Sequence, residues 1–285
     1  MFRNLQFIDL QRKTSDSCHI DSCRFNEEVN VVLFRRISVL IRKFFVFTGL
    51  FFLTGIACAF ETCNEYSVRV TTHPIPMQFS GALARWDEIR NNLDSSAESI
   101  IIGDSLAEAW PDYMFRGLFD GDAVQNLGVA RDRIQNILWR LDDTGLNKIK
   151  PKRIIIVAGT NNLSDENLDP CAIIIGLKYI VKKARYIWPM AEVYLFPIMP
   201  RGSDFGFRNE SRKIINAALA EWRYEKFKFI NVNEIELTCN MITMADEHDL
   251  KYIKNFPVCD KYRVDNLHLT EAGYKFLGAS LTGIK

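Results

Sequence analysis

The feature that most constrains the fold is an apolar run, Ile100 to Ile102, that ends in Gly103-Asp104-Ser105. An unbroken β-branched run closed by a glycine is typical of a strand buried on both faces, and such strands belong to parallel sheets. The carboxyl edge of a parallel sheet is where α/β proteins place their binding and catalytic side chains. The sequence therefore predicts Ser105 at the edge where a functional site would form.

Four further strand-like runs follow, and helix-like stretches alternate with them. The expected strands cover residues 99–102, 123–127, 153–158, 192–198 and 227–232, and the expected helices cover 82–93, 133–141, 171–188, 210–224 and 270–277. Strands that alternate with helices predict a doubly wound α/β fold with a five-stranded parallel sheet. We expect one catalytic domain over residues 60–285, with residues 233–264 as a surface insertion beside the site.

The first 59 residues form an N-terminal extension with a different pattern. Arg42 and Lys43 precede the uncharged run Phe44–Ala57, and Ala57-Cys58-Ala59 is a small-x-small site. This pattern predicts a signal peptide that is cleaved after Ala59, and hence a secreted or periplasmic protein. The alternative is an uncleaved segment, residues 44–59, that anchors the protein in a membrane, although a spanning helix needs about 20 apolar residues.

Four cysteines follow the predicted cleavage point: Cys63, Cys171, Cys239 and Cys259. An even number in an exported protein favours disulfides. We expect Cys239–Cys259 first, because these two flank one loop-like segment, and then Cys63–Cys171, with four buried thiols as the alternative. No cysteine and histidine spacing is typical of a zinc site, so no metal is predicted. A net charge of +1 without a long basic run excludes a nucleic-acid partner, and the sequence leaves the oligomeric state open.

Three of the polar stretches in the chain follow strands at one sheet edge, and a fourth precedes the last helix. Asp265 and His268 in the fourth are three positions apart, so Asp265 can hold one imidazole nitrogen while the other takes the proton of Ser105. The backbone N–H groups of Ser105 and Gly128 and the side-chain amide of Asn161 are expected to form an oxyanion hole. These residues predict acyl transfer through a Ser-His-Asp triad without a cofactor.

These stretches together resemble the SGNH, or GDSL-type, hydrolase family, and within it the platelet-activating-factor acetylhydrolase group. The shared stretches are Ile137-Leu138-Trp139-Arg140-Leu141, Ile149-Lys150-Pro151-Lys152, Gly159-Thr160-Asn161-Asn162, Pro200-Arg201-Gly202 and Leu267-His268-Leu269-Thr270. The resemblance implies a three-layer α/β/α, flavodoxin-like fold. It also implies the triad Ser105, Asp265 and His268, with Gly128 and Asn161 in the oxyanion hole.

The activity expected from these features is that of a serine esterase that removes short acyl groups, above all acetyl, from an O-acetylated glycan or a lipid ester. Arg131, Asn162 and Arg201 are the predicted substrate contacts. One alternative is a lipid esterase of the phospholipase or lysophospholipase type. The other is a non-catalytic protein that binds glycans or lipids on the same scaffold.

Overall fold

The computed structural model describes residues 63–119, 121–242 and 259–282. The described residues all belong to one compact unit of the chain, residues 60–285, which we call the second unit. The predicted signal peptide and the alternative membrane anchor lie outside the described residues. Within the described ranges, no helix has the length and apolar character that crossing a membrane requires.

A five-stranded sheet forms the centre of the second unit. Its strands are β1 (Ser99–Gly103), β2 (Val124–Gly128), β3 (Arg153–Val157), β4 (Glu192–Leu195) and β5 (Phe227–Phe229). They run parallel in the order β2-β1-β3-β4-β5, so β1 has a neighbour on each side. This arrangement confirms the predicted α/β fold with a five-stranded parallel sheet.

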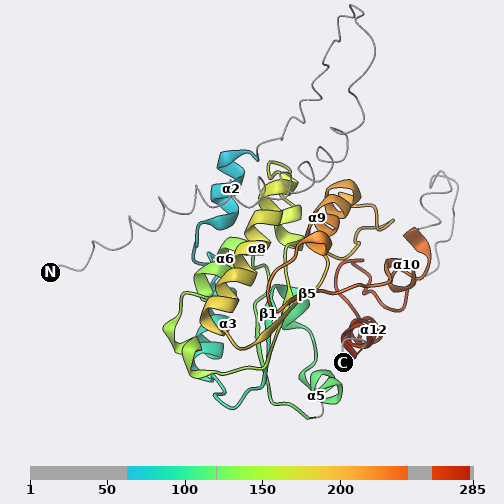
Figure 1. Ribbon diagram of the computed structural model, residues 1–285. Coiled ribbons are helices and arrows are strands. Elements are labelled where there is room, and N and C mark those ends of the chain that lie inside the picture. The colour runs from blue at the N-terminus through green and yellow to red at the C-terminus, as the bar shows by residue number, and fades with distance from the viewer. Residues whose placement is uncertain (1–62, 120, 243–258, 283–285) are drawn as a thin grey trace, which may run out of the picture. The chain divides into compact units, whose positions relative to one another are not determined.

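Helices cover both faces of the sheet (Figure 1). One layer contains α2 (Glu65–Thr72), α3 (Ser80–Asn91), α6 (Ile134–Arg140), α7 (Thr160–Leu163), α8 (Pro170–Ile187) and α9 (Asn209–Glu221). The other contains α4 (Ser105–Glu108), α5 (Asp112–Leu118), α10 (Glu234–Leu237) and α12 (Glu271–Thr282). A short 3-10 helix, η1 (Thr144–Lys148), precedes β3.

The isoleucine run of β1 serves both layers because strand side chains alternate between the two faces. Ile100 and Ile102 pack in one core and Ile101 packs in the other, and all three are fully buried. The run is therefore apolar at every position because the strand is buried on both faces, as the sequence predicted. Ser105 follows it at the carboxyl edge of a strand in the interior of the sheet.

Two disulfides fasten the segments around this domain. Cys63 pairs with Cys171 at the start of α8, with their Cα atoms 5.6 Å apart, and Cys239 pairs with Cys259, with their Cα atoms 5.5 Å apart. Both predicted pairings are confirmed. The first disulfide also tethers the start of α2, a helix outside the predicted ranges, to α8.

Candidate active site

Ser105 is the first residue of α4, directly after β1. Asp104 caps this helix because its Oδ1 accepts the N–H of Leu106 at 2.9 Å. A Cβ on Gly103 would lie 1.9 Å from the carbonyl oxygen of Val157, so only glycine fits beside β3. The backbone N–H of Ser105 lies in the first turn of a helix, where N–H groups have no intrahelical partner. Ser105 therefore carries both the candidate nucleophile, its hydroxyl, and a backbone N–H without an intrahelical partner.

A loop before α12 carries Asp265 and His268, and backbone contacts fix its shape. The N–H of Arg263 donates to the carbonyl of His268 at 2.8 Å, which closes the loop on itself. The hydroxyl of Tyr262 donates to the carbonyl of Pro200 at 2.9 Å, which ties the loop to the chain that follows β4. The histidine thus comes from a well-supported loop at the carboxyl edge of the sheet.

The structure brings Ser105, His268 and Asp265 together, although Ser105 and His268 are 163 positions apart in the chain. His268 Nε2 lies 2.9 Å from Ser105 Oγ, and His268 Nδ1 lies 2.7 Å from Asp265 Oδ2. The other carboxylate oxygen of Asp265 accepts the N–H groups of Leu267 at 3.0 Å and His268 at 2.9 Å. Partial burial raises the pKa of Asp265, but the bonds from His268 and Leu267 outweigh it and lower the pKa to about 2.

A second carboxyl group, that of Asp104, is next to the serine in a different environment. It is completely buried, and this burial raises the pKa of Asp104 to about 7, with the neighbouring Asp132 adding to the effect. The bond from the Leu106 N–H acts in the opposite direction. Within the described residues, Asp104 Oδ2 has no hydrogen-bond partner.

Gly128 lies at the end of β2, where the backbone of α4 packs against it. A Cβ at this position would be 2.2 Å from the backbone nitrogen of Glu108, so close packing alone requires a glycine. Its N–H donates to Asn126 Oδ1 at 2.8 Å. An oxyanion could use this N–H only if the bond to Asn126 broke. The predicted oxyanion role of Gly128 therefore stays a prediction, and this bond argues against it.

The turn after β2 offers another donor. The N–H of Ala130 donates to the carboxylate of Glu108, and that of Asp132 donates to the carbonyl of Val129 at 3.2 Å. The N–H of Arg131 has no hydrogen bond to any described residue, and Arg131 has a left-handed φ of 68°. The sequence predicted Arg131 as a substrate contact and did not single out its N–H.

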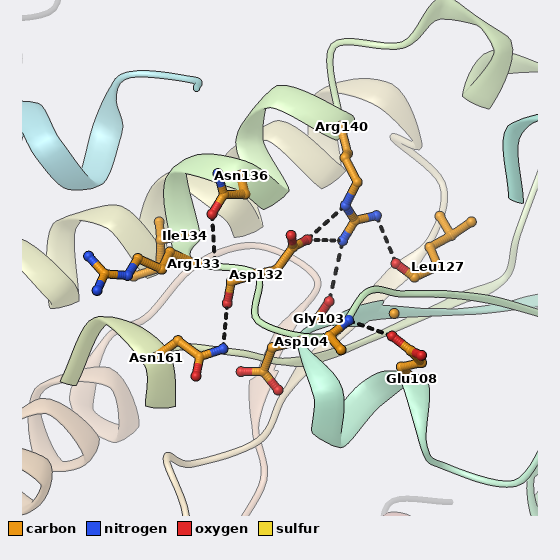
Figure 2. Close-up of polar contacts among 12 residues, drawn as sticks. Gly103, Asp104, Glu108, Leu127, Asp132, Arg133, Ile134, Asn136, Arg140 and Asn161 are labelled. Carbon is orange, nitrogen blue, oxygen red and sulfur yellow. Dashed lines mark hydrogen bonds and ion pairs between the residues drawn. The ribbon is translucent and has the colours of Figure 1, made fainter. Parts of the chain in front are cut away.

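Asn161 lies in the first turn of α7, at the end of β3. Its Nδ2 donates to the carbonyl oxygen of Asp132 at 2.8 Å, so the side chain reaches across to the turn after β2 (Figure 2). The amide nitrogen carries two hydrogens. One therefore remains for an oxyanion while the other holds the side chain in place.

The two arginines predicted to contact substrate both stack on aromatic rings. The guanidinium of Arg131 lies 4.8 Å from the ring centre of Phe79, and that of Arg201 lies 4.2 Å from the ring centre of Phe207. Arg201 also donates to the hydroxyl of Ser164. Both side chains thus have intramolecular partners that a substrate anion would share.

Asn162, the third predicted contact, is turned into the protein. It is fully buried, its Oδ1 accepts the N–H of Ile134 at 2.8 Å, and its Nδ2 donates to Gln135 Oε1 at 3.0 Å. These bonds join α7 to α6 and leave the amide no access to a ligand. We therefore drop Asn162 from the substrate contacts.

A cavity of about 300 Å³ opens beside the turn after β2. Its lining comes from residues 75–79 and Ala82 on one side and from residues 130–133, Gln135 and Asn136 on the other. Among the described residues, one group of side chains is close enough to hold a metal, namely Cys239, Cys259 and Asp260. Its two sulfur atoms form a disulfide, so we assign no metal to it.

The GDSL-like Lipase/Acylhydrolase family matches residues 99–276, which is more than half of the chain. The protein belongs to this family. This GDSL acylhydrolase is an ester hydrolase by its family, as the motif resemblance implied.

Several relatives and solved structures are similar to this acylhydrolase. Platelet-activating factor acetylhydrolase IB subunit alpha1 from Rattus norvegicus is 28% identical over 200 residues, which cover 65% of this chain and 84% of the relative. The alpha2 subunit from the same species is 30% identical over 185 residues, covering 64% and 72%. A solved structure described as a platelet activating factor protein from Streptococcus pneumonia has a TM-score of 0.52 at 21% identity, covering 72% and 92%, and shares the fold.

A buried ion pair between Asp132 and Arg140 lies behind the site and was not predicted from the sequence. One signal could have revealed it. Arg140 occurs three positions after Ile137, on the apolar face of the predicted helix over residues 133–141. A charged side chain on a buried helix face needs a partner of opposite charge, so this position indicates a buried ion pair.

Proposed function

We propose that this protein is a serine esterase in which Ser105, His268 and Asp265 act as a catalytic triad. The observation that carries the proposal is the continuous chain of contacts from Ser105 Oγ to His268 Nε2 at 2.9 Å and from His268 Nδ1 to Asp265 Oδ2 at 2.7 Å. In this arrangement His268 accepts the proton of the serine hydroxyl while the hydroxyl oxygen attacks the ester carbonyl. Asp265, kept ionised by its lowered pKa, stabilises the imidazolium.

The tetrahedral intermediate then needs donors for its oxyanion. The N–H groups of Ser105 and Arg131 and the remaining hydrogen of Asn161 Nδ2 are the donors with no competing bond in the described structure. Collapse of the intermediate expels the alcohol, which takes the proton from His268, and leaves an acyl group on Ser105. Water activated by His268 hydrolyses this acyl-enzyme and restores the hydroxyl.

The acyl group that we propose is acetyl, because the curated relatives are named as acetylhydrolases. An O-acetylated glycan is the first substrate class, since two disulfides favour an oxidising compartment outside the cytosol. A lipid ester is the second, because the relatives' name includes a platelet-activating factor. Hydrolysis rates on acetylated xylan and on a short-chain phospholipid acetate would separate the two classes.

Replacing the nucleophile tests the proposal. S105A is expected to reduce kcat for p-nitrophenyl acetate by about 10⁴ to 10⁶, as in other triad enzymes. S211A is a matched control because Ser211 is a half-buried serine on α9 whose hydroxyl has no hydrogen bond to a triad residue in the described structure. Turnover by S105A at more than a tenth of the wild-type rate would refute the mechanism, provided that the variant keeps the wild-type melting temperature.

A further inference from the structure

Arg140, at the end of α6, lies in the core behind the site. Its side chain is 2% exposed and that of its partner Asp132 is 0% exposed. The Nε and Nη2 atoms of Arg140 lie 2.8 Å and 2.7 Å from the same oxygen, Asp132 Oδ2. A buried ion pair gives little net stability, because desolvation of the two charges offsets their attraction. The other contacts of Arg140 therefore say more about its role than the ion pair does.

The same guanidinium also reaches the ends of two strands. Nη1 donates to the carbonyl of Leu127 at 2.7 Å, and Nη2 donates to the carbonyl of Gly103 at 3.3 Å. Gly103 ends β1, two residues before Ser105, and Leu127 lies near the end of β2. One side chain thus connects the carboxyl ends of β1 and β2 with the turn that follows β2 (Figure 2).

Asp132 extends this connection to α7, the helix that follows β3. Arg140 contacts the carboxylate of Asp132. The backbone carbonyl oxygen of Asp132 accepts a hydrogen bond from Asn161 Nδ2 at 2.8 Å. The N–H of Arg131, which has no partner in the described structure, belongs to the same turn. Two donors proposed for the oxyanion hole, the Asn161 amide and the Arg131 N–H, therefore adjoin Asp132, whose carboxylate Arg140 contacts.

We propose that Arg140 is a positioning residue for the oxyanion hole, and this rests on the esterase function proposed above. Arg140 fixes Asp132, and through it the Asn161 amide, relative to Ser105. It touches neither the triad nor solvent, and its guanidinium lies against the ring of Trp86 at 5.2 Å. A lysine would keep the charge but lose the planar fork that reaches three acceptors at once.

The first test separates positioning from stability. R140K is expected to lower kcat for p-nitrophenyl acetate by about 30-fold, with KM within about threefold, because misplaced donors are felt mainly in the transition state. R212K is the matched control. Arg212 is also fully buried, pairs with Glu234 and donates to a backbone carbonyl in the segment after β4, that of Ile198, at 3.2 Å. We expect R212K to lower the melting temperature to a similar extent but to change kcat by less than about threefold.

A double-mutant cycle with N161A gives the decisive result. N161A alone is expected to cost about 10² in kcat, as the loss of one oxyanion donor does. In the N161A background, R140K should then cost less than about fivefold, because part of what it positions is already gone. Equal losses in the two backgrounds would overturn the proposal, and so would an N161A variant with wild-type kcat.

A second pair of changes keeps the test valid if R140K does not fold. R140M with D132N removes both charges, so no unpaired charge stays buried, and the same kcat loss and the same dependence on Asn161 are expected. The two proposals fail differently. Activity in S105A would refute the esterase mechanism, whereas an inactive S105A combined with independent effects of R140K and N161A would refute only the role of Arg140.

Discussion

Ser105 is flanked by two carboxyl groups that the protein treats in opposite ways. Asp265, on the loop before α12, is 46% exposed at its side chain, and three hydrogen bonds from Leu267 and His268 lower its pKa to about 2. Asp104, between β1 and α4, is completely buried, and burial raises its pKa to about 7. The same residue type is thus stabilised as an anion on one side of the serine and disfavoured as one on the other.

The difference indicates that a negative charge is stabilised at Asp265 in the triad and not at Asp104 beside the serine. The loop that carries Asp265 supplies N–H donors that hold the anion, which a triad needs in order to stabilise an imidazolium. For Asp104 the hydrogen-bond donor is the Leu106 N–H in the first turn of α4, and Asp104 acts there as a helix cap. We therefore expect substitutions at Asp265 to change the rate of reaction and substitutions at Asp104 to change stability.

The largest expected effect is on catalysis by D265N. The amide keeps the size of the side chain but cannot stabilise the imidazolium or select the productive tautomer of His268, so kcat should fall by about 10⁴. D260N is a suitable control because the Asp260 side chain is 76% exposed and forms a surface pair with Lys261. Steady-state hydrolysis of p-nitrophenyl acetate at pH 8 measures both. A loss below about tenfold in D265N would remove Asp265 from the mechanism.

A smaller effect is expected on stability in D104N. A raised pKa means that the contribution of Asp104 is fully present below its ordinary pKa and is lost as the pH rises through about 7. Asparagine can still cap α4 and does not titrate. The free energy of unfolding of D104N relative to wild type should therefore rise by about 2 kcal/mol between pH 5 and pH 8.

Urea denaturation across this pH range measures that change, with kcat at pH 8 recorded alongside. The predicted result is a relative stability that climbs with pH while kcat stays within about tenfold of wild type. A relative stability that is independent of pH would mean that Asp104 does not titrate between pH 5 and pH 8. A kcat loss as large as that of D265N would erase the distinction between the two carboxyl groups.

Much of the fold follows from local sequence signals. The apolar runs of β1 and β3 are long and β-branched, and the alternation of strands with helices allows few topologies. The pairing of Asp265 with His268 is also local, because the two are three residues apart. The meeting of His268 with Ser105 was predicted from the residue types that a triad needs and from the family resemblance, because the loop before α12 does not directly follow a strand.

Other features depend on contacts between distant residues, and the sequence could not show them. The N–H of Gly128 is bonded by the side chain of Asn126, and a glycine at a strand end does not reveal whether its N–H is free. Asn162 points into the core because α6 offers it partners, whereas its neighbour Asn161 points toward the turn after β2. The role of Arg140 rests on carbonyl groups that only the folded sheet brings within reach.

The most direct test of the central claim, that His268 activates Ser105 as the nucleophile, is peptide mapping by mass spectrometry after reaction with a fluorophosphonate. A triad predicts one phosphonyl adduct per chain, on the peptide that contains Ser105, and no adduct in S105A or H268A. A non-catalytic binding protein on this scaffold would stay unlabelled. An unlabelled wild-type protein, or an adduct on another residue, would contradict the account.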